Sequence, residues 1–208
     1  MKIKESIILE INKTGKIDIS KFMQLSQFEN NGYYIKNNPI GSNNDFITAP
    51  EISQMFGEIL TIFLIDYWEK NIKTNFNLVE LGPGSGALTN DVLRTATTNQ
   101  KFLNAINLTL VEKNNYLISL QKNNISFDRI VWNKEFNVEK KNRSSIIYSN
   151  EFFDCFPVRQ FYKKDKWYEK FIQYNDSLKY FNFVSEKVDN NKLLKILSKF
   201  DDVKVAEI

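Results

Sequence analysis

Residues 79–86 read VELGPGSG and connect an apolar run, residues 77–81, to a helix-like stretch, residues 87–96. Glycines at such a junction let the backbone turn tightly and approach a ligand, because no Cβ stands in the way. The helix that begins after them presents backbone N–H groups without partners inside the helix. The stretch therefore predicts a ligand-binding turn between a strand and a helix. A glycine-rich turn without a ligand is the alternative.

Strand-like and helix-like segments alternate after this turn. Further apolar runs at residues 107–112, 130–132 and 145–149 read as strands, and helical stretches precede the first two of them. This alternation is typical of βαβ units and a parallel sheet. The predicted fold class is therefore α/β, with a Rossmann-like cofactor-binding half domain over residues 75–157.

The segments before and after this half domain have different sequence patterns. Residues 1–74 read as mainly helical, and the helix expected over residues 51–69 is apolar nearly all round, which indicates burial. After Pro157, aromatic runs divided by polar turns predict an antiparallel β-meander and then a helix over residues 191–200. We therefore expect an N-terminal helical cap with a site-covering loop over residues 1–74, and a meander insertion with a C-terminal helix over residues 158–208.

The composition excludes several classes of site. The chain has no histidine and one cysteine, Cys155, among 208 residues. Histidine-dependent nucleophile pairs, histidine-based metal sites, disulfides and thiolate metal clusters are therefore excluded, and no metal is expected. The net charge of +3 arises from 28 Lys and Arg against 25 Asp and Glu, and we expect no nucleic-acid partner.

The chain carries no targeting or membrane-spanning pattern. No stretch reaches the roughly 20 apolar residues that a spanning helix needs. Glu5 and Glu10 interrupt the apolar N-terminus, whereas signal and transit peptides avoid acidic residues. With the single cysteine, these features predict a cytoplasmic protein, or one of the mitochondrial matrix if the chain is eukaryotic.

Acidic residues beside the glycine turn indicate its ligand. The glycines also fit the dinucleotide fingerprint, but Glu80 precedes them, where a carboxylate suits an ammonium or a sulfonium better than a pyrophosphate. Glu112 ends the next strand, where an acid either accepts both ribose hydroxyls or caps a helix. Trp132 ends the third strand and either stacks on an adenine or packs in the core. This pattern favours S-adenosylmethionine over NAD, with cofactor-binding glycines Gly82, Gly84 and Gly86.

The sequence NEFFD, residues 150–154, follows the fourth predicted strand. In open α/β sheets the ligand lies beyond the carboxyl ends of the strands. We therefore assign Asn150 to the cofactor and expect Glu151 and Asp154 as catalytic carboxylates, with a turn cap as the alternative for each acid. Cys155 is expected to pack, since no base is present to activate it.

Three segments together resemble the MidA family of S-adenosylmethionine-dependent methyltransferases, which includes the mitochondrial arginine methyltransferase that assists assembly of respiratory complex I. They are DFITAPEISQMFGE (45–58), VELGPGSG (79–86), and NEFFD with the following PV and QF (150–161). The resemblance implies a class I methyltransferase domain with S-adenosylmethionine as cofactor. It implies a protein substrate, an arginine on a subunit of the respiratory NADH dehydrogenase. It also implies that the loop with Asp45, Thr48 and Glu51 folds over the site.

One departure from the family concerns length. Members of the family are substantially longer, and the later strands of their sheet do not map onto this sequence. The sheet is therefore expected to be incomplete, and its fourth strand would have an open edge. Either the chain is a fragment that lacks its C-terminal half, or it is a gene product shortened by decay, or a partner or a homo-oligomer completes the sheet.

The expected reaction is methyl transfer to a guanidinium nitrogen. Because the pKa of arginine lies above about 12, a lone pair must first be localised. Glu151 and Asp154 are expected to hold the guanidinium, with Asp45 and Glu51 in reserve. The rival hypothesis is a non-catalytic module that binds the cofactor or assists assembly. An NAD-dependent oxidoreductase is the third and least favoured reading.

Overall fold

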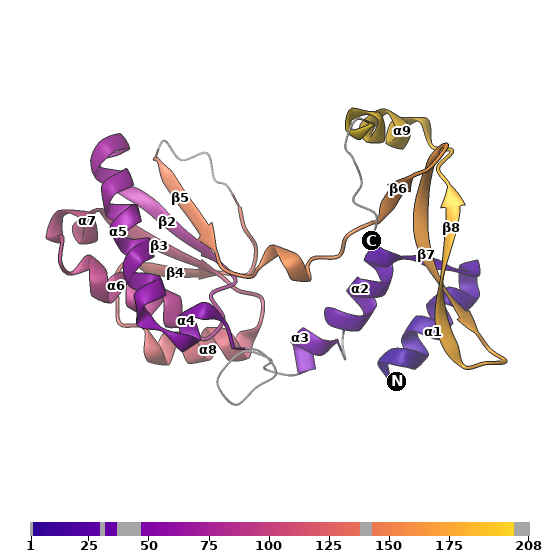
Figure 1. Ribbon diagram of the computed structural model, residues 1–208. Coiled ribbons are helices and arrows are strands. Elements are labelled where there is room, and N and C mark those ends of the chain that lie inside the picture. Colours follow the sequence, from indigo (N-terminus) through magenta and orange to yellow (C-terminus); the bar gives the residue numbers. More distant parts are fainter. Residues whose placement is uncertain (1, 30–31, 37–46, 138–142, 202–208) are drawn as a thin grey trace. The chain divides into compact units, whose positions relative to one another are not determined.

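The structure is a computed structural model and describes residues 2–29, 32–36, 47–137 and 143–201. The chain divides into two compact units (Figure 1). We call residues Asn38–Cys155 the sheet unit, and residues Met1–Asn37 together with Phe156–Ile208 the meander unit. None of the helices in the described ranges combines the length and the apolar composition that a membrane span requires.

A parallel four-stranded sheet forms the centre of the sheet unit. Leu81 of one central strand lies opposite both Val111 and Ser149, and every neighbouring pair is parallel. The predicted α/β class and all four predicted strands are confirmed. In the spatial order β4-β3-β2-β5, the strands are β2 (Phe76–Leu81), β3 (Ile106–Val111), β4 (Ile130–Asn133) and β5 (Ser145–Ser149).

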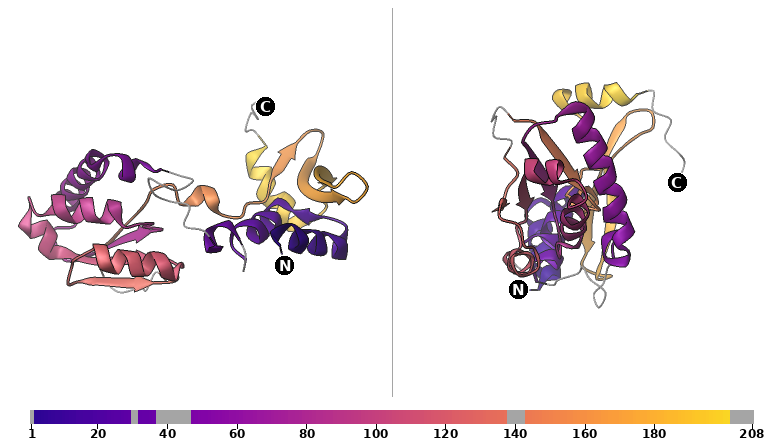
Figure 2. Two further views of the ribbon diagram at one scale, coloured as in Figure 1. Left: turned by 90° about the horizontal axis from the view of Figure 1, so that it is seen from below. Right: turned by 90° about the vertical axis from the view of Figure 1, so that its left-hand side faces the viewer.

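Helices cover one face of this sheet. Leu78, Leu108 and Leu110 point to that face and are fully or almost fully buried. Side chains from α5, α6 and α7, together with Ile125 directly after α8, complete the same core cluster. These helices are α5 (Gln54–Asn71), the long purple helix of Figure 2, then α6 (Ala87–Ala96), α7 (Gln100–Ala105) and α8 (Asn115–Asn124).

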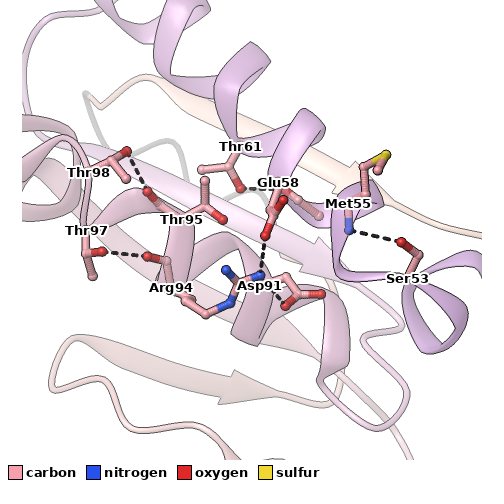
Figure 3. Close-up of polar contacts among 10 residues, drawn as sticks. Ser53, Met55, Glu58, Thr61, Asp91, Arg94, Thr95, Thr97 and Thr98 are labelled. Atoms are coloured by element: carbon pink, nitrogen blue, oxygen red, sulfur yellow. Dashed lines mark hydrogen bonds and ion pairs between the residues drawn. The ribbon is translucent and has the colours of Figure 1, made fainter.

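The contact between α5 and α6 is close because Gly57 has no side chain. A Cβ at Gly57 would lie 2.4 Å from the Cβ of Asp91 on α6. Beside this contact, the Arg94 Nη2 atom lies 3.0 Å from both the Glu58 Oε1 atom and the Asp91 Oδ1 atom (Figure 3). The buried face of α5 is formed by Gly57, Thr61, Leu64 and Trp68.

The helix predicted over residues 51–69 is interrupted. Helix α4 (Ala49–Ile52) ends at Ser53, and the Ser53 hydroxyl accepts a hydrogen bond from the Met55 N–H at 3.2 Å as the N-cap of α5. The prediction that this apolar helix is buried is wrong for one side. Large apolar side chains between Met55 and Tyr67 are exposed there, opposite the buried face.

The meander unit contains the predicted antiparallel β-meander. Its strands pair in sequence order, β6 with β7 and β7 with β8. The helix expected over residues 191–200 is α9 (Asn191–Leu197), continued by a 3-10 turn (Ser198–Phe200). The strands are β6 (Phe161–Lys163), β7 (Trp167–Asn175) and β8 (Tyr180–Lys187).

The N-terminal helices belong to this meander unit. A two-residue strand, β1 (Ile17–Asp18), pairs antiparallel with β7 and joins α1 (Ile3–Thr14) to α2 (Ile19–Gln27). Ile7, Ile11 and Ile172 share one buried cluster. A single turn of helix, α3 (Tyr33–Lys36), follows.

The two units divide the chain differently from the three expected segments. The residues of the expected cap, 1–74, are divided between the two units, because α1 and α2 pack with the meander whereas α5 packs on the sheet. The physical reason is the pairing of β1 with β7, a contact between segments far apart in sequence that no local pattern reveals.

We expect Gly57→Ala to lower the free energy of unfolding by about 1–3 kcal/mol, because the added Cβ overlaps Asp91. Urea titration followed by circular dichroism measures this loss. In a double-mutant cycle, Asp91→Gly removes the opposing Cβ, so Gly57→Ala costs less in that background. An equal cost in both backgrounds contradicts a close contact at this point.

Candidate functional site

The turn between β2 and α6 depends on three glycines with positive φ angles, Gly82 at 65°, Gly84 at 56° and Gly86 at 87°. Glycine adopts such angles readily, whereas other residues do so at a cost. Gly82 is also sterically required, since a Cβ there would lie 2.3 Å from the Phe152 Cδ2 atom. The buried Gln121 of α8 donates from Nε2 to the Gly84 carbonyl at 2.7 Å and so fixes the centre of the turn.

The tips of β2 and β3 lie side by side. The Gly82 N–H donates to the Val111 carbonyl at 3.0 Å, and Glu112 follows Val111 directly. The Glu112 carboxylate accepts a hydrogen bond from the Asn114 N–H at 2.9 Å, and burial raises the pKa of Glu112. Glu112 therefore caps the turn before α8 in this structure, and its ribose-binding role stays a prediction.

Glu80 lies inside the sheet unit, one residue before the end of β2. Its exposed fraction is 2%. The Tyr148 hydroxyl donates to the Glu80 Oε2 atom at 2.9 Å, and the Thr89 hydroxyl donates to the same oxygen. Burial raises the pKa of Glu80 to about 7, against the lowering effect of these two hydrogen bonds. Glu80 is thus a carboxyl group that changes charge near neutral pH.

A cleft of about 410 Å³, counted with its space open to solvent, lies beside the glycine turn. Three of its lining residues are carboxylates, Glu51, Glu80 and Glu151, and no Lys or Arg belongs to the lining in the described part of the chain. This charge favours a cationic ligand. The lining consists of Thr48, Pro50, Glu51, Glu80, Gly82, Pro83, Gly84, Ser85, Ala87, Leu88, Asn150 and Glu151.

Two segments bring the outer acids to this cleft. Glu51 lies in α4, and the Ser85 hydroxyl donates to its Oε1 atom, which ties α4 to the glycine turn. Glu151 and Asn150 follow β5 directly. Glu151 has a φ angle of 46°, which is uncommon for a residue other than glycine. Backbone strain of this kind clusters at functional sites.

Other residues singled out in the sequence lie elsewhere. Asp154 is exposed in the 3-10 turn Phe153–Cys155 and does not line the cleft. Trp132 packs against the core and donates from Nε1 to the Gln121 Oε1 atom at 3.1 Å. The roles of both residues stay predictions. Asp45 lies outside the described residues. The Cys155 thiol donates to the Phe152 carbonyl at 3.1 Å, and burial raises its pKa.

Sequence reasoning missed the residues that hold Glu80 in place. Tyr148 lies opposite Glu80 in the register of β2 and β5, and Thr89 lies in the first turn of α6. The position of Tyr148, one residue before the end of a predicted strand, was a usable signal, because parallel strands in register place equivalent positions side by side. Thr89 offered no comparable signal.

We expect the stability of the chain to fall by about 3 kcal/mol between about pH 5 and about pH 8, because the pKa of Glu80 is about 7 in the folded chain and ordinarily 4.5. The protonated carboxyl makes its full contribution to stability at pH values below 4.5, its ordinary pKa. This contribution is lost as the pH rises through about 7, the pKa in the folded chain. Glu80→Gln should remove this fall. Tyr148→Phe, the control, keeps the buried carboxyl but removes a hydrogen bond that lowers its pKa, so the fall persists and extends to higher pH. Urea titrations across this pH range measure both, and an unchanged slope in Glu80→Gln contradicts the assignment.

Comparison with known proteins identifies the family. Residues 59–206 match a family described as putative S-adenosyl-L-methionine-dependent methyltransferases. The chain is 33% identical over 205 residues to the mitochondrial protein arginine methyltransferase NDUFAF7 of Homo sapiens, covering 84% of this chain and 46% of that protein. The Danio rerio counterpart is 34% identical over 190 residues, covering 78% and 44%. The chain therefore spans about half the length of these curated relatives.

A solved structure shares the fold. It is a likely methyl transferase from Burkholderia thailandensis bound to S-adenosyl-homocysteine, with a TM-score of 0.77 and 21% identity, covering 96% of this chain and 53% of that one. A second crystal structure from the same organism gives a TM-score of 0.75 at 22% identity, covering 96% and 51%. The family match extends over well over half of the chain, and the chain therefore belongs to this family of putative S-adenosyl-L-methionine-dependent methyltransferases.

Proposed function

We propose that the chain binds S-adenosylmethionine in the cleft beside the glycine turn and takes part in methyl transfer to an arginine of a protein. The observation that carries this proposal is the cleft itself, where a glycine turn and three carboxylates meet at the carboxyl ends of parallel strands. Family membership supports the donor, and the names of the curated relatives support the acceptor.

The groups in the cleft fit a ligand with both a cation and a carboxylate. The N–H groups of Gly84 and Ser85 donate to no acceptor in the part of the chain that the structure describes, and they suit a ligand carboxylate. Both hydroxyls that hold Glu80 use Oε2, so Oε1 is left to accept from a ligand ammonium. Asn150 adds an amide at the cleft. We also assign Glu112, which follows β3, and Trp132, which lies in β4, to the cofactor, although neither lines the cleft.

S-adenosylmethionine, when bound, supplies a methyl group on a positively charged sulphur. The contribution of this chain is to hold the acceptor. A carboxylate that accepts hydrogen bonds from two guanidinium nitrogens keeps the positive charge there, so the third nitrogen can use its lone pair to form a bond to the methyl carbon while the bond from that carbon to sulphur breaks. The attacking nitrogen then gives up one proton to a neighbouring carboxylate, and S-adenosylhomocysteine is the second product. We assign this role to Glu151, which lines the cleft, with Asp154 three residues further along as the second carboxylate and Glu51 as a reserve. Orientation of the two reactants then supplies much of the remaining rate enhancement.

The finer features of the function are also proposals. We infer a subunit of the respiratory NADH dehydrogenase as the protein substrate, and the cytoplasm, or the mitochondrial matrix if the chain is eukaryotic, as the place of action. The curated relatives are named as mitochondrial proteins. We also propose that Thr48 and Glu51, the N-cap residue and a residue of helix α4, cover the bound ligands from one side of the cleft.

A second candidate function is a non-catalytic module that binds the cofactor. The observation in its favour is that the chain spans about half the length of its curated relatives. Both candidates bind the cofactor, but only the first transfers methyl groups. Titration calorimetry together with a measurement of methylarginine formation therefore separates them.

We expect Gly84→Ala to weaken binding of S-adenosylhomocysteine about tenfold or more, because Gly84 lines the cleft and its φ angle of 56° disfavours alanine. Titration calorimetry on the whole chain measures the affinity. Gly15→Ala is the matched control, because Gly15 has a φ angle of 80° and no atom near its missing Cβ, and it lies outside the cleft. Equal losses of affinity in both variants, or none in Gly84→Ala, contradict the proposed binding site.

We expect Glu151→Gln to lower methyl transfer about 100-fold while affinity for S-adenosylhomocysteine stays the same, because the amide no longer holds the guanidinium charge. The measurement is methylarginine formation, by mass spectrometry, on purified NADH dehydrogenase subunits. Glu135→Gln, an exposed acid of the same unit, is the control. Normal turnover by Glu151→Gln refutes its role, and cofactor binding without transfer by the unmodified chain favours the module.

A further inference from the structure

We propose that Tyr148 and Thr89 are positioning residues for the cofactor, and that the cleft releases a proton when it takes up the ammonium group of this ligand. The two hydroxyls hold one oxygen of the Glu80 carboxylate and leave the other for the ammonium, and the proton passes from Glu80 to the solvent. The inference rests on the proposed function, because it takes S-adenosylmethionine as the ligand of this cleft. It adds the residues that orient Glu80 and a dependence of affinity on pH.

Two hydroxyls from different elements contact a single oxygen of Glu80. Tyr148 of β5 donates to the Oε2 atom at 2.9 Å, and Thr89 of α6, which is fully buried, donates to the same atom. Among the residues that the structure describes, no donor contacts the Oε1 atom. Because Glu80 lines the cleft although it is only 2% exposed, Oε1 is an acceptor that a ligand ammonium can use.

The fold sets the positions of both hydroxyls. Tyr148 lies opposite Glu80 in the parallel register of β2 and β5, and it packs against the core cluster of the sheet unit. Thr89 lies in the first turn of α6, which follows the glycine turn at the end of β2. The carboxylate is therefore oriented before a ligand arrives, so binding does not have to supply the free energy of ordering it.

The groups around Glu80 determine how its charge responds to a ligand. On β3 the residue opposite Glu80 is Leu110, which is apolar. On β5 burial and the nearby Glu80 raise the pKa of Tyr148 well above its ordinary value, so the phenol keeps its proton and remains a donor. The cleft adds Glu51 and Glu151, and its described lining contains no Lys or Arg. Within that lining, a bound ammonium is therefore the cation that favours the charged form of Glu80.

The protonation state of Glu80 sets the direction of the pH dependence. Burial raises the pKa of Glu80 to about 7, so about half of the molecules carry this proton at pH 7. A bound ammonium lowers the pKa, and the proton leaves as the ligand binds. Affinity should therefore rise with pH through about 7. If the pKa in the complex lies well below 6, affinity is about tenfold lower at pH 6 than at pH 8.

The first test counts protons with two probes on the whole chain. S-adenosylhomocysteine and 5′-methylthioadenosine are both thioethers of adenosine, but only the first carries an ammonium group. Calorimetric titration at pH 6, in two buffers of different ionisation enthalpy, should give about 0.9 proton released per S-adenosylhomocysteine and none per methylthioadenosine. Absence of S-adenosylhomocysteine binding overturns the proposed cofactor site and this inference together. Binding without release of a proton, or equal release with both probes, overturns this inference alone.

Substitutions assign the proton and the positioning role. Tyr148→Phe and Thr89→Val each remove a hydrogen bond that lowers the pKa of Glu80. In each variant the midpoint of the pH dependence should move up by about one pH unit, and affinity for S-adenosylhomocysteine at pH 7 should fall about fivefold. Glu80→Gln should release no proton, and its affinity should not vary between pH 6 and pH 8.

Conservative variants separate positioning from a loss of structure. Thr89→Ser keeps the hydroxyl and should restore the midpoint of the unmodified chain. Tyr180→Phe is the matched control for Tyr148→Phe, because Tyr180 lies in β8 of the meander unit, is 48% exposed and does not line the cleft. Circular dichroism checks that each variant is folded. The proposal is overturned by an unchanged midpoint in Tyr148→Phe and Thr89→Val, by an equal shift in Tyr180→Phe, or by proton release from Glu80→Gln.

Discussion

Parallel pairing of β2 with a strand on each side is the constraint on which the site depends. Because Leu81 is aligned with both Val111 and Ser149, the chain leaves the sheet at three neighbouring points. The glycine turn, the segment after β3 and the segment with Glu151 start from these points. The hydrogen bond from the Tyr148 hydroxyl to the Glu80 carboxylate follows from the same register, because β5 places Tyr148 opposite Glu80.

Burial of Glu80 links the fold to the charge of the cleft. The chain has a small positive net charge, yet the described lining of the cleft contains three acids and no base. One of the three is held where burial opposes its charge. A cation beside Glu80 favours the charged form, so binding of a cationic ligand and loss of the proton from Glu80 are coupled.

The order and type of the elements were predictable, because hydrophobic runs and glycines are local signals. The four strands of the sheet and helix α6 agree with the prediction to within one residue. The two-residue strand β1 was not predictable, because its partner β7 lies far along the chain. The exposed face of α5 was also missed, since an apolar helix pattern does not tell which side is covered within one chain.

The site was predictable only in part, for a related reason. Gly82, Glu80 and Glu151 were found because strand ends in a parallel sheet converge, and the cleft contains all three. Whether the other predicted residues reach the cleft depends on the direction of their side chains, which local sequence patterns do not reveal. Trp132 turns to Gln121 in the core, and Glu112 turns back to the backbone of Asn114. Thr89 belongs to the site because its hydroxyl donates a hydrogen bond to the Glu80 carboxylate from the other side of the glycine turn.

The discontinuous meander unit has a consequence for biosynthesis. Its helices α1 and α2 are made before the sheet unit. Ile7 and Ile11 of α1 share a buried cluster with Ile172, which is made only after the sheet unit. The sheet unit between them contains its own core and can condense while the meander is still being translated. Closing so long a loop is slow because its entropy must be lost before the contacts form. The first helices made are therefore among the last to find their native neighbours.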